Sequence, residues 1–319
     1  MRIIGQDMEP ADGPRRWSRR ALLRGLGALA AAAALPRAAL AAAAPLLAKR
    51  VPATGEQVPV VGLGTWITFD VAPLEMFLGP RVEVLRRLLG GGGGVVDSSP
   101  MYGRAEDVLG RCLKRLRDDR GLRAATKVWT PLQWMGRDQL ADSQRLWGLQ
   151  RFWLLQIHNM LSWEAHLDTL RKAKADGRTR YVGITTSHGR RHEEMEAALR
   201  RERFDFVQLT YNILDREAER RLLPVALERG VAVIANRPFR RGELIDRLAG
   251  KPLPPWAREI DCASWPQFLL KFIVSHPAVT CAIPATSKPG HLVENLGAAR
   301  GRMPDAAMRQ RMVRYVEGL

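Results

Sequence analysis

Short runs of apolar and β-branched residues alternate along the chain with longer amphipathic segments. Runs of four to seven such residues are typical of buried strands, and apolar positions three and four apart are typical of helices packed on a core. An alternation of strands with helices predicts a parallel sheet, and eight repeats predict closure into a (β/α)8 TIM barrel. We find eight runs: Val60–Thr65, Val95–Ser98, Ala124–Val128, Phe152–His158, Tyr181–Thr185, Phe206–Leu209, Val231–Ala235 and Cys281–Pro284.

The polar residues that end these runs are evenly spaced. From Asp97 to Asn236 the steps lie between 23 and 31 residues, close to the ~30 residues of one strand–helix unit. The last step, to Thr286, is longer and predicts an insertion around Leu253–Trp256. An open doubly wound sheet is the alternative fold, but it needs a Gly-x-Gly-x-x-Gly after its first strand. The glycines of Gly90–Gly94 follow a helix instead, so we interpret them as a connection.

The ends of several helices are also marked. Arg104–Leu116 has one apolar face, which predicts an amphipathic helix. Ser162 is the expected N-cap of a helix that ends at Asp176-Gly177. A further helix is expected over Glu217–Arg229, stopped by Gly230.

The first 48 residues differ from this pattern and are expected to lie outside the fold. Arg19-Arg20 precede an uncharged stretch, Gly25–Pro36, and Ala39-Leu40-Ala41 resembles a cleavage site. This order is typical of a twin-arginine signal peptide, which we assign to residues 1–44, leaving 45–319 as one barrel domain. We therefore expect periplasmic localisation and the twin-arginine export machinery as a partner. An uncleaved membrane anchor over residues 25–48 and a disordered Ala-rich tail are the alternatives.

The composition argues against a nucleic-acid-binding protein, a disulfide-rich protein and a metalloprotein. The net charge is +17, of which the leader contributes +4. The basic residues occur as scattered pairs such as Arg200-Arg201, without interleaved aromatic residues, so we expect a solvated helical surface and no nucleic-acid partner. Three cysteines do not make a disulfide framework. The six histidines show no metal-ligand spacing, so no metal site is expected. The sequence leaves the oligomeric state open.

Four polar residues fall at the ends of three successive strands. Asp97 and Tyr102 lie in Asp-Ser-Ser-Pro-Met-Tyr-Gly, Lys127 ends the next run, and His158 ends the one after it. Catalytic residues of α/β barrels occupy such strand ends. From about residue 51 to about residue 300 the chain resembles the aldo-keto reductase family, whose catalytic tetrad is Asp, Tyr, Lys and His in this order.

The resemblance implies an oxidoreductase that transfers a hydride from NAD(P)H to a carbonyl substrate, an aldehyde or a ketone. Tyr102 would donate the proton, although a free tyrosine has a pKa of about 10. We expect the Lys127 ammonium to lower that pKa, Asp97 to hold Lys127, and His158 to orient the substrate carbonyl. Trp66 and Trp129 are expected to line an apolar substrate pocket.

The resemblance also implies a nucleotide site after the last strand. Ile283–Asn295 opens a helix with Pro289 in its first turn, and a helix N-terminus favours phosphate. NADP (NADPH) is the expected cofactor, with NAD as the alternative. The family's pattern assigns the 2′-phosphate, the adenine and the nicotinamide to groups of residues of this chain. These residues are Ser287, Lys288, His291, Glu294 and Asn295 for the adenosine end, and Thr185, Thr186, Gln208 and Asn236 for the nicotinamide.

Asn236 is a departure from the family's pattern. Many members have a tyrosine at the end of the seventh strand that stacks on the nicotinamide, whereas this chain has Asn236 followed by Arg237. An alternative function is therefore a catalytically weak barrel that binds nicotinamide nucleotide as a sensor or regulatory subunit. A second alternative is a basic module that binds an anionic component of the cell envelope.

Overall fold

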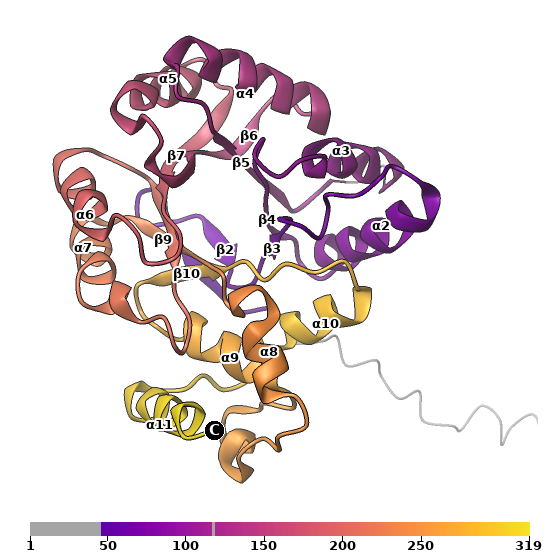
Figure 1. The fold of residues 1–319 in the computed structure, drawn as a ribbon, viewed down its shortest axis with the longest axis vertical. Coiled ribbons are helices and arrows are strands. Elements are labelled where there is room, and N and C mark those ends of the chain that lie inside the picture. The colour runs from indigo at the N-terminus through magenta and orange to yellow at the C-terminus, as the bar shows by residue number, and fades with distance from the viewer. Residues whose placement is uncertain (1–45, 117–118) are drawn as a thin grey trace, which may run out of the picture. The chain divides into compact units, whose positions relative to one another are not determined.

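The computed structural model describes residues 46–116 and 119–319, so the predicted signal peptide, with Arg19 and Arg20, lies outside the described residues. Eight parallel strands form one sheet in sequence order, and bridges between Val61 and Ala282 and between Gly64 and Ala285 join its two edges (Figure 1). The predicted (β/α)8 barrel is thus confirmed. Its strands are β3 (Leu63–Gly64), β4 (Gly94–Asp97), β5 (Leu122–Val128), β6 (Phe152–Ile157), β7 (Thr179–Thr185), β8 (Phe206–Thr210), β9 (Ala232–Asn236) and β10 (Val279–Ala282).

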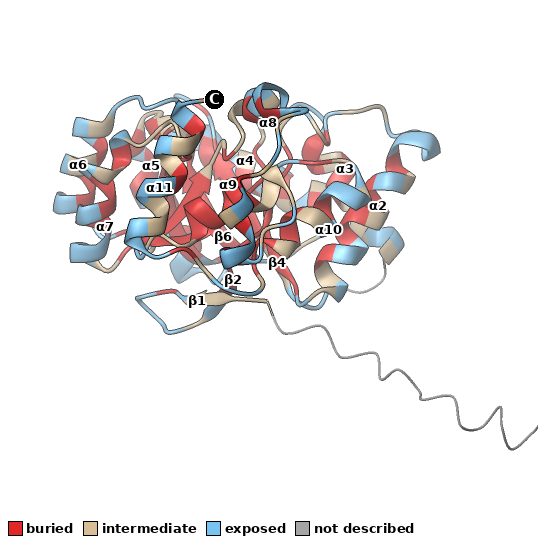
Figure 2. Ribbon diagram, turned by 90° about the horizontal axis from the view of Figure 1, so that it is seen from below, coloured by how far each residue is buried: buried red, intermediate tan, exposed pale blue. Residues whose placement is uncertain are grey.

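Helices surround the barrel as an outer ring (Figure 1). Figure 2 shows their outward sides exposed and the sides that face the sheet buried, as amphipathic sequences require. The helices are α2 (Glu75–Gly90), α3 (Ala105–Leu116), α4 (Gln133–Trp147), α5 (Trp163–Ala175), α6 (His192–Arg201), α7 (Leu222–Arg229), α8 (Glu243–Leu248), α9 (Trp265–Val274), α10 (Pro289–Gly297) and α11 (Ala306–Glu317). Short 3-10 turns are η1 (His158–Met160), η2 (Glu217–Glu219), η3 (Arg240–Gly242) and η4 (Pro255–Ile260).

The insertion expected before the last strand is present. After β9 the chain forms η3, α8 and η4 before it reaches α9. No comparable run of extra helices separates the earlier strands in the part of the chain that the structure describes. This segment lies over the barrel mouth and contributes to the large pocket described below.

The fold begins earlier than the sequence indicates. β1 (Ala48–Arg50) pairs antiparallel with β2 (Gln57–Pro59), and the Leu47 amide donates to the carbonyl of Ala299 at 2.8 Å. Leu47 and Ala48 therefore belong to the fold; they lie within the domain assigned to 45–319, but among the first 48 residues that we expected to lie outside the fold. Figure 2 shows this hairpin at the end of the barrel opposite α8. Strands of three residues carry too little periodicity to be recognised.

One helix prediction is confirmed in its bounds but not in its cap, and a second needs correction. Ser162 stands at the N-cap of α5, but its backbone is left-handed and its side chain makes no capping hydrogen bond. The helix expected over Glu217–Arg229 is divided into η2 and α7. Pro224 explains the division, because it cannot donate to the carbonyl of residue 220 and its ring would collide with that carbonyl in a continuous helix.

The barrel interior is layered along the strands. One cluster of buried apolar side chains fills the interior near β1 and β2, and it includes Val95, Ala125, Leu154, Phe206 and Ile234. Side chains two residues apart on a strand point to the same face. The interior position after each of these residues is therefore the polar one, at Asp97, Lys127, Gln156, Gln208 and Asn236. The alternation thus places one polar layer at the carboxyl ends of the strands, where barrel enzymes carry their active sites.

Candidate active site

Asp97 and Lys127 form a buried ion pair in this polar layer. Lys127 Nζ donates to Asp97 Oδ2 at 2.6 Å and to the carbonyl of Ser98 at 2.7 Å. Both side chains are almost fully inaccessible to water. Burial lowers the pKa of Lys127, but Asp97 and Tyr102 outweigh it and hold that pKa above its ordinary value. Lys127 is thus an ammonium at neutral pH, as the sequence predicts.

Two glutamines complete the surroundings of Asp97. Gln156 Nε2 and Gln208 Nε2 donate to Asp97 Oδ1 at 3.1 and 2.9 Å. Both carboxylate oxygens therefore accept hydrogen bonds, as a buried carboxylate requires. We did not single out Gln156 in the sequence. Its position at an interior strand end was the signal that could have identified it.

Tyr102 reaches the site from the loop between β4 and α3. Lys127 Nζ lies 5.1 Å from the centre of its ring. Gly103 allows the turn, because it has φ of +57° and a Cβ there would lie 2.5 Å from Asp70 Oδ1. The Arg104 amide donates to that same oxygen at 2.9 Å, which fixes the start of α3 behind Tyr102.

The pKa of Tyr102 differs from our expectation. Burial raises the pKa of Tyr102, and although Lys127 lowers it, Asp97 raises it further, so the net direction is upward. The predicted influence of Lys127 is present but smaller than the cost of burying a phenolate. Tyr102 is consequently a neutral phenol at physiological pH, which is the form that can donate a proton.

His158 lies beside Tyr102 with its ring edge-on. The two ring centres are 5.6 Å apart, and the ring planes are inclined by 87°. Burial, with a smaller contribution from Lys127, lowers the pKa of His158 to about 2. The imidazole is therefore neutral and has one donor and one acceptor nitrogen.

Ser99 is the hydrogen-bond partner of His158. Ser99 Oγ lies 2.7 Å from His158 Nδ1, and both residues are buried. A serine hydroxyl that donates to Nδ1 leaves the proton of the neutral ring on Nε2. Ser99 escaped our sequence analysis because nothing in a Ser-Ser-Pro segment indicates which hydroxyl faces a histidine 59 residues away.

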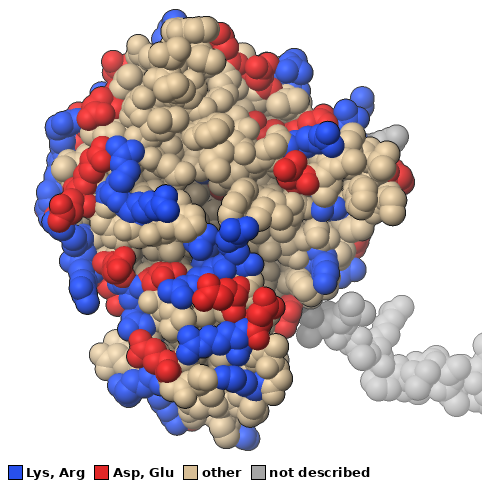
Figure 3. Space-filling model, viewed as in Figure 1, with Lys and Arg blue, Asp and Glu red and all other residues tan. Residues whose placement is uncertain are grey.

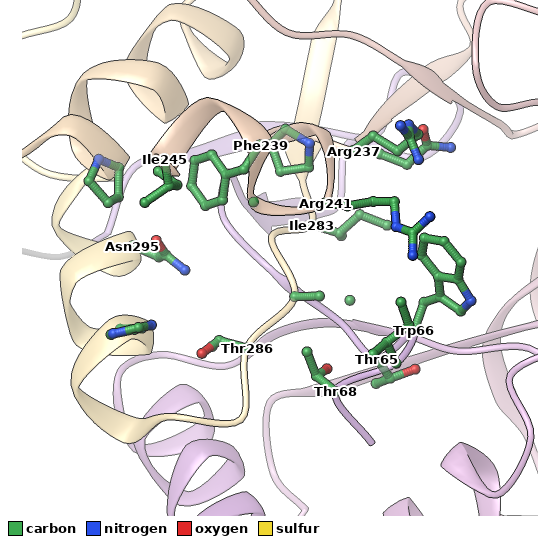
Figure 4. A pocket seen from close by; sticks show the side chains of 18 of the residues that line it. Thr65, Trp66, Thr68, Arg237, Phe239, Arg241, Ile245, Ile283, Thr286 and Asn295 are labelled. Carbon is green, nitrogen blue, oxygen red and sulfur yellow. The ribbon is translucent and has the colours of Figure 1, made fainter. Parts of the chain in front are cut away.

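A cavity of about 920 Å³ opens at the barrel mouth. Asp97, Tyr102 and His158 line it, together with Trp66 and Met101, whereas Lys127 lies behind them in the polar layer. The cavity extends to the segment after β10 and to α10 on the other side (Figure 4). A space of this size is in the upper part of the range for cofactor and small-molecule pockets, ~300–1,000 Å³.

The residues predicted for the adenosine end are partly gathered there. His291, Glu294 and Asn295 on α10 line the cavity, but Ser287 and Lys288 do not. Thr286 lines it as well, and its hydroxyl accepts from the Lys288 amide at 3.1 Å. Figure 4 shows Thr286 and Asn295 on one side of the cavity. Lys288 is the exposed N-cap residue of α10, and Pro289 follows at its first position as predicted.

The residues predicted for the nicotinamide end lie at neighbouring strand ends. Thr185, Gln208 and Asn236 line the cavity, whereas Thr186 turns its hydroxyl to the carbonyl of Arg190 at 2.5 Å. Asn236 Nδ2 donates to the carbonyl of Thr186 at 3.0 Å, and Asn236 Oδ1 accepts from Thr210 Oγ1 at 2.7 Å. Asn236 thus belongs to a hydrogen-bonded layer where an aromatic platform was the family expectation.

The two tryptophans predicted for the substrate pocket differ. Trp66 lines the cavity, and its ring centre lies 6.5 Å from that of Tyr102. Trp129 is not among the lining residues and is 42% exposed. Gln139 binds its backbone on both sides, since the Trp129 amide donates to Gln139 Oε1 and Gln139 Nε2 donates to the Trp129 carbonyl.

Within residues 46–116 and 119–319, no group of three histidine, cysteine, aspartate or glutamate side chains could hold a metal ion. In the same residues, no helix is both long and apolar enough to cross a bilayer.

Comparisons with known proteins agree with this geometry. The model of the aldo/keto reductase family matches residues 60–311. Aldo-keto reductase YhdN of Bacillus subtilis is 23% identical in an alignment over 212 residues that covers 61% of this chain and 62% of that relative. The match thus covers less than two thirds of the relative's length.

Solved structures extend the similarity to nearly the whole barrel. An aldo/keto reductase from Klebsiella pneumoniae, crystallised with NADP and acetate, has a TM-score of 0.67 and 25% identity over 82% of this chain and 93% of its own. The holo form of AKR11C1 from Bacillus halodurans has a TM-score of 0.68 and 21% identity over 85% of this chain and 96% of its own.

Proposed function

The chain belongs to the aldo/keto reductase family, and on that premise we propose that it is an NADPH-dependent oxidoreductase that reduces the carbonyl group of an aldehyde or ketone. The observation that carries this proposal is the convergence of Asp97, Tyr102, Lys127 and His158 at one end of a large cavity. A carbonyl needs a hydride on carbon and a proton on oxygen. These four residues supply the proton.

Each residue has a separate task in that proton transfer. Tyr102 donates its phenolic proton to the carbonyl oxygen, and Lys127 stabilises the phenolate that remains. Asp97 holds Lys127 charged and oriented, since a buried ammonium without a carboxylate is costly. Neutral His158 donates from Nε2 to the carbonyl oxygen, with Ser99 fixing its tautomer.

The cavity suits a dinucleotide in size and in the character of its two ends. NADPH, when bound, supplies the hydride. Thr185, Gln208 and Asn236 would hold the nicotinamide end. At the other end, His291, Glu294 and Asn295 would hold the adenosine, and Ser287 and Lys288 lie beside them at the start of α10. Solved relatives from Klebsiella pneumoniae carry NADP and NADPH. We expect Lys288 and His291 to favour NADP over NAD through the 2′-phosphate.

A second candidate function rests on Asn236. Its side chain is engaged by Thr210 and Thr186 and offers no aromatic face to a nicotinamide. Without that aromatic face the nicotinamide would be held less firmly. The protein would then bind the nucleotide as a sensor or regulatory subunit and turn over little substrate. The complete tetrad favours the reductase.

We also propose that the protein acts in the periplasm after twin-arginine export. The support is the order of Arg19-Arg20, an uncharged stretch and small residues in the leader. The nucleotide would then be bound before export, because the cytoplasm is where a folded twin-arginine substrate meets NADPH.

The experiment that tests the reductase measures where the hydride goes. Purified protein is incubated with NADPH deuterated at both C4 positions and with a panel of aldehydes and ketones. We expect at least one alcohol product to carry deuterium on the former carbonyl carbon. Protein that binds NADPH but gives no labelled product with any member would contradict the reductase and favour the sensor.

A further inference from the structure

The backbone directly after His158 has an unusual geometry. Asn159, Met160 and Ser162 have φ values of 52°, 56° and 46°. Residues other than glycine and asparagine rarely adopt this left-handed region, so Met160 and Ser162 are strained there. Strained segments persist only where the surrounding structure holds them, and they are concentrated at functional sites. The turn after His158 therefore needs partners outside itself.

Arg191 is the main partner of this turn. Its Nη1 donates to the carbonyl of Asn159 at 3.0 Å and to the carbonyl of Met160 at 2.8 Å. Arg191 comes from the loop after β7, where it stands at the N-cap of α6. Hydrogen bonds from a charged donor are stronger than neutral ones. Two of them to successive carbonyls fix the peptide group between Asn159 and Met160.

Glu194 holds the Arg191 side chain in place. Glu194 Oε2 accepts from Arg191 Nε at 2.7 Å, and Glu194 Oε1 accepts from Arg191 Nη2 at 2.5 Å. The same carboxylate also accepts from Trp163 Nε1 at 3.2 Å. Trp163 is buried at the start of α5, directly after the left-handed turn. Arg191 and Glu194 thus join α6 to both sides of the turn.

The turn also contacts the cofactor end of the site. The Asn159 amide donates to Thr185 Oγ1 at 2.9 Å, and Asn159 Oδ1 accepts from Ser187 Oγ at 3.2 Å. A hydroxyl has one proton and two lone pairs, so Thr185 keeps its proton for an acceptor in the cavity that it lines. The position of the turn therefore influences both the His158 ring and the Thr185 hydroxyl.

Arg191 differs from an arginine in an ordinary surface ion pair. Figure 3 shows basic and acidic side chains next to one another on the side of α6 and α7, and exposed pairs of this kind add little to stability. Arg145 pairs with Asp142 in that way, and its guanidinium binds no backbone carbonyl among residues 46–116 and 119–319. Arg191 is also partly exposed, but it binds the backbone of a neighbouring loop. Its loss should therefore leave the fold intact and release the turn.

We propose that Arg191, held by Glu194, is a positioning residue for carbonyl reduction, because it keeps the left-handed turn after His158 in place. Neither side chain lines the cavity, so both act through the turn. Without Arg191 the strained backbone can relax, and His158 and Thr185 move with it. The inference rests on the proposed reductase function and extends that site to a pair of residues outside the cavity.

The first test needs no turnover, so it separates this inference from the proposed function. 15N NMR of the NADP-loaded protein measures the His158 ring, whose signals are assigned by their loss in His158→Gln. We expect one tautomer in the wild type, because Ser99 holds Nδ1. In Arg191→Asn, which tolerates the left-handed backbone, the movement of His158 away from Ser99 should shift or broaden these signals. Unchanged His158 signals in Arg191→Asn would overturn the proposal.

The second test compares kcat with stability, using an aldehyde that the wild type reduces. In Arg191→Asn we expect kcat to fall about 10- to 100-fold, the scale on which a small displacement of a reacting group lowers a rate. NADPH affinity should fall by a smaller factor, because Thr185 is one of several cofactor contacts. Arg191→Lys keeps a charged donor and should restore part of kcat. A lower Tm in Arg191→Asn with unchanged kcat would show a purely structural role and overturn the proposal.

Arg190→Asn is the matched control. Arg190 is the exposed neighbour of Arg191, and its side chain makes no hydrogen bond or ion pair within the described part of the chain. We expect kcat and the His158 signals of Arg190→Asn to match those of the wild type. A loss of kcat as large as in Arg191→Asn would show a general charge effect and overturn the proposal. No carbonyl reduction by the wild type, with the His158 response to Arg191→Asn present, would contradict the reductase and keep Arg191 as the group that holds the turn.

Discussion

At the scale of single residues, burial decides which protons are available. The cost of a buried phenolate exceeds the attraction of Lys127, so Tyr102 keeps its proton, while the same burial leaves His158 neutral. The task of Lys127 is thus to stabilise the phenolate as it forms during the reaction. It does not ionise Tyr102 beforehand.

This argument predicts the pH dependence of carbonyl reduction. The active form of Tyr102 is protonated, and a pKa raised above 10.0 keeps it protonated to higher pH. The rate of reduction, kcat/KM, should therefore stay level through neutral pH and fall only above about pH 10. A pH profile with an alkaline midpoint near neutrality would contradict the raised pKa.

Ser99 gives a second prediction at this scale. Ser99→Ala removes the partner of His158 Nδ1 and allows the ring to change tautomer. We expect kcat to fall about tenfold with NADPH affinity unchanged, and 15N NMR to show a changed tautomer at His158. Ser99→Thr, which keeps the hydroxyl, should restore both. An unchanged tautomer in Ser99→Ala would remove Ser99 from the mechanism.

The candidate site was only partly predictable from the sequence. Asp97, Lys127 and His158 end apolar runs, and a polar residue at a buried strand end is a clear signal. The Ser99–His158 and Gln208–Asp97 hydrogen bonds join residues 59 and 111 positions apart. Such contacts depend on side-chain directions that periodicity does not give, and Trp129 was assigned to the pocket for want of that information.

At the scale of elements, the same periodicity gave the barrel but not its short additions. Eight apolar runs mark eight strands, because both faces of a parallel strand are buried. The β1–β2 hairpin has strands of three residues, and the division of α7 from η2 depends on one proline. A strand of three residues or a single proline cannot be distinguished from chance variation in the pattern of apolar and polar residues.

Glu106 links three elements and gives a prediction about stability. Its buried carboxylate accepts from Thr126 Oγ1 at 2.5 Å on β5, and from Ser143 Oγ and Trp147 Nε1, each at 2.9 Å, on α4. Burial raises the pKa of Glu106 above 4.5 despite these three donors. As pH rises above 4.5, the unfolded chain ionises first, so this group makes stability fall with rising pH.

Glu106→Gln should reduce this component of the pH dependence of Tm, and Glu106→Ala should cost about 2–4 kcal/mol because three buried donors lose their partner. Thermal melts from about pH 4 to about pH 8 check both expectations. An identical pH dependence in the wild type and in Glu106→Gln would show that Glu106 does not titrate as proposed.

At the scale of the whole molecule, many basic residues form ion pairs on the surface and a few line the pocket. Arg200 and Arg221 pair with glutamates on α6 and α7, as expected of a solvated helical surface. Arg237 and Arg241 differ from these, since they line the cavity and form no ion pair with a carboxylate of the described residues. Net charge alone could not distinguish the two groups.

The leader gives the prediction about the whole chain in the cell. Arg19-Arg20 precede the uncharged stretch, so replacing both by lysine should leave unprocessed protein in the cytoplasm. Fractionation and immunoblotting of the full-length protein measure this. The matched control is Arg15-Arg16 changed to lysine, which lies outside the proposed motif and should be exported normally. Periplasmic accumulation of the Arg19-Arg20 variant would exclude twin-arginine export.

The central claim, that Tyr102 donates the proton in carbonyl reduction, is tested most directly by Tyr102→Phe, which removes one oxygen and keeps the ring. NADPH affinity and the rate of NADPH-dependent aldehyde reduction are measured on the same preparation. The account predicts nearly unchanged affinity and a rate lower by a factor of about 10² to 10⁴, the range for a positioned acid. A rate within a few-fold of the wild type would contradict it.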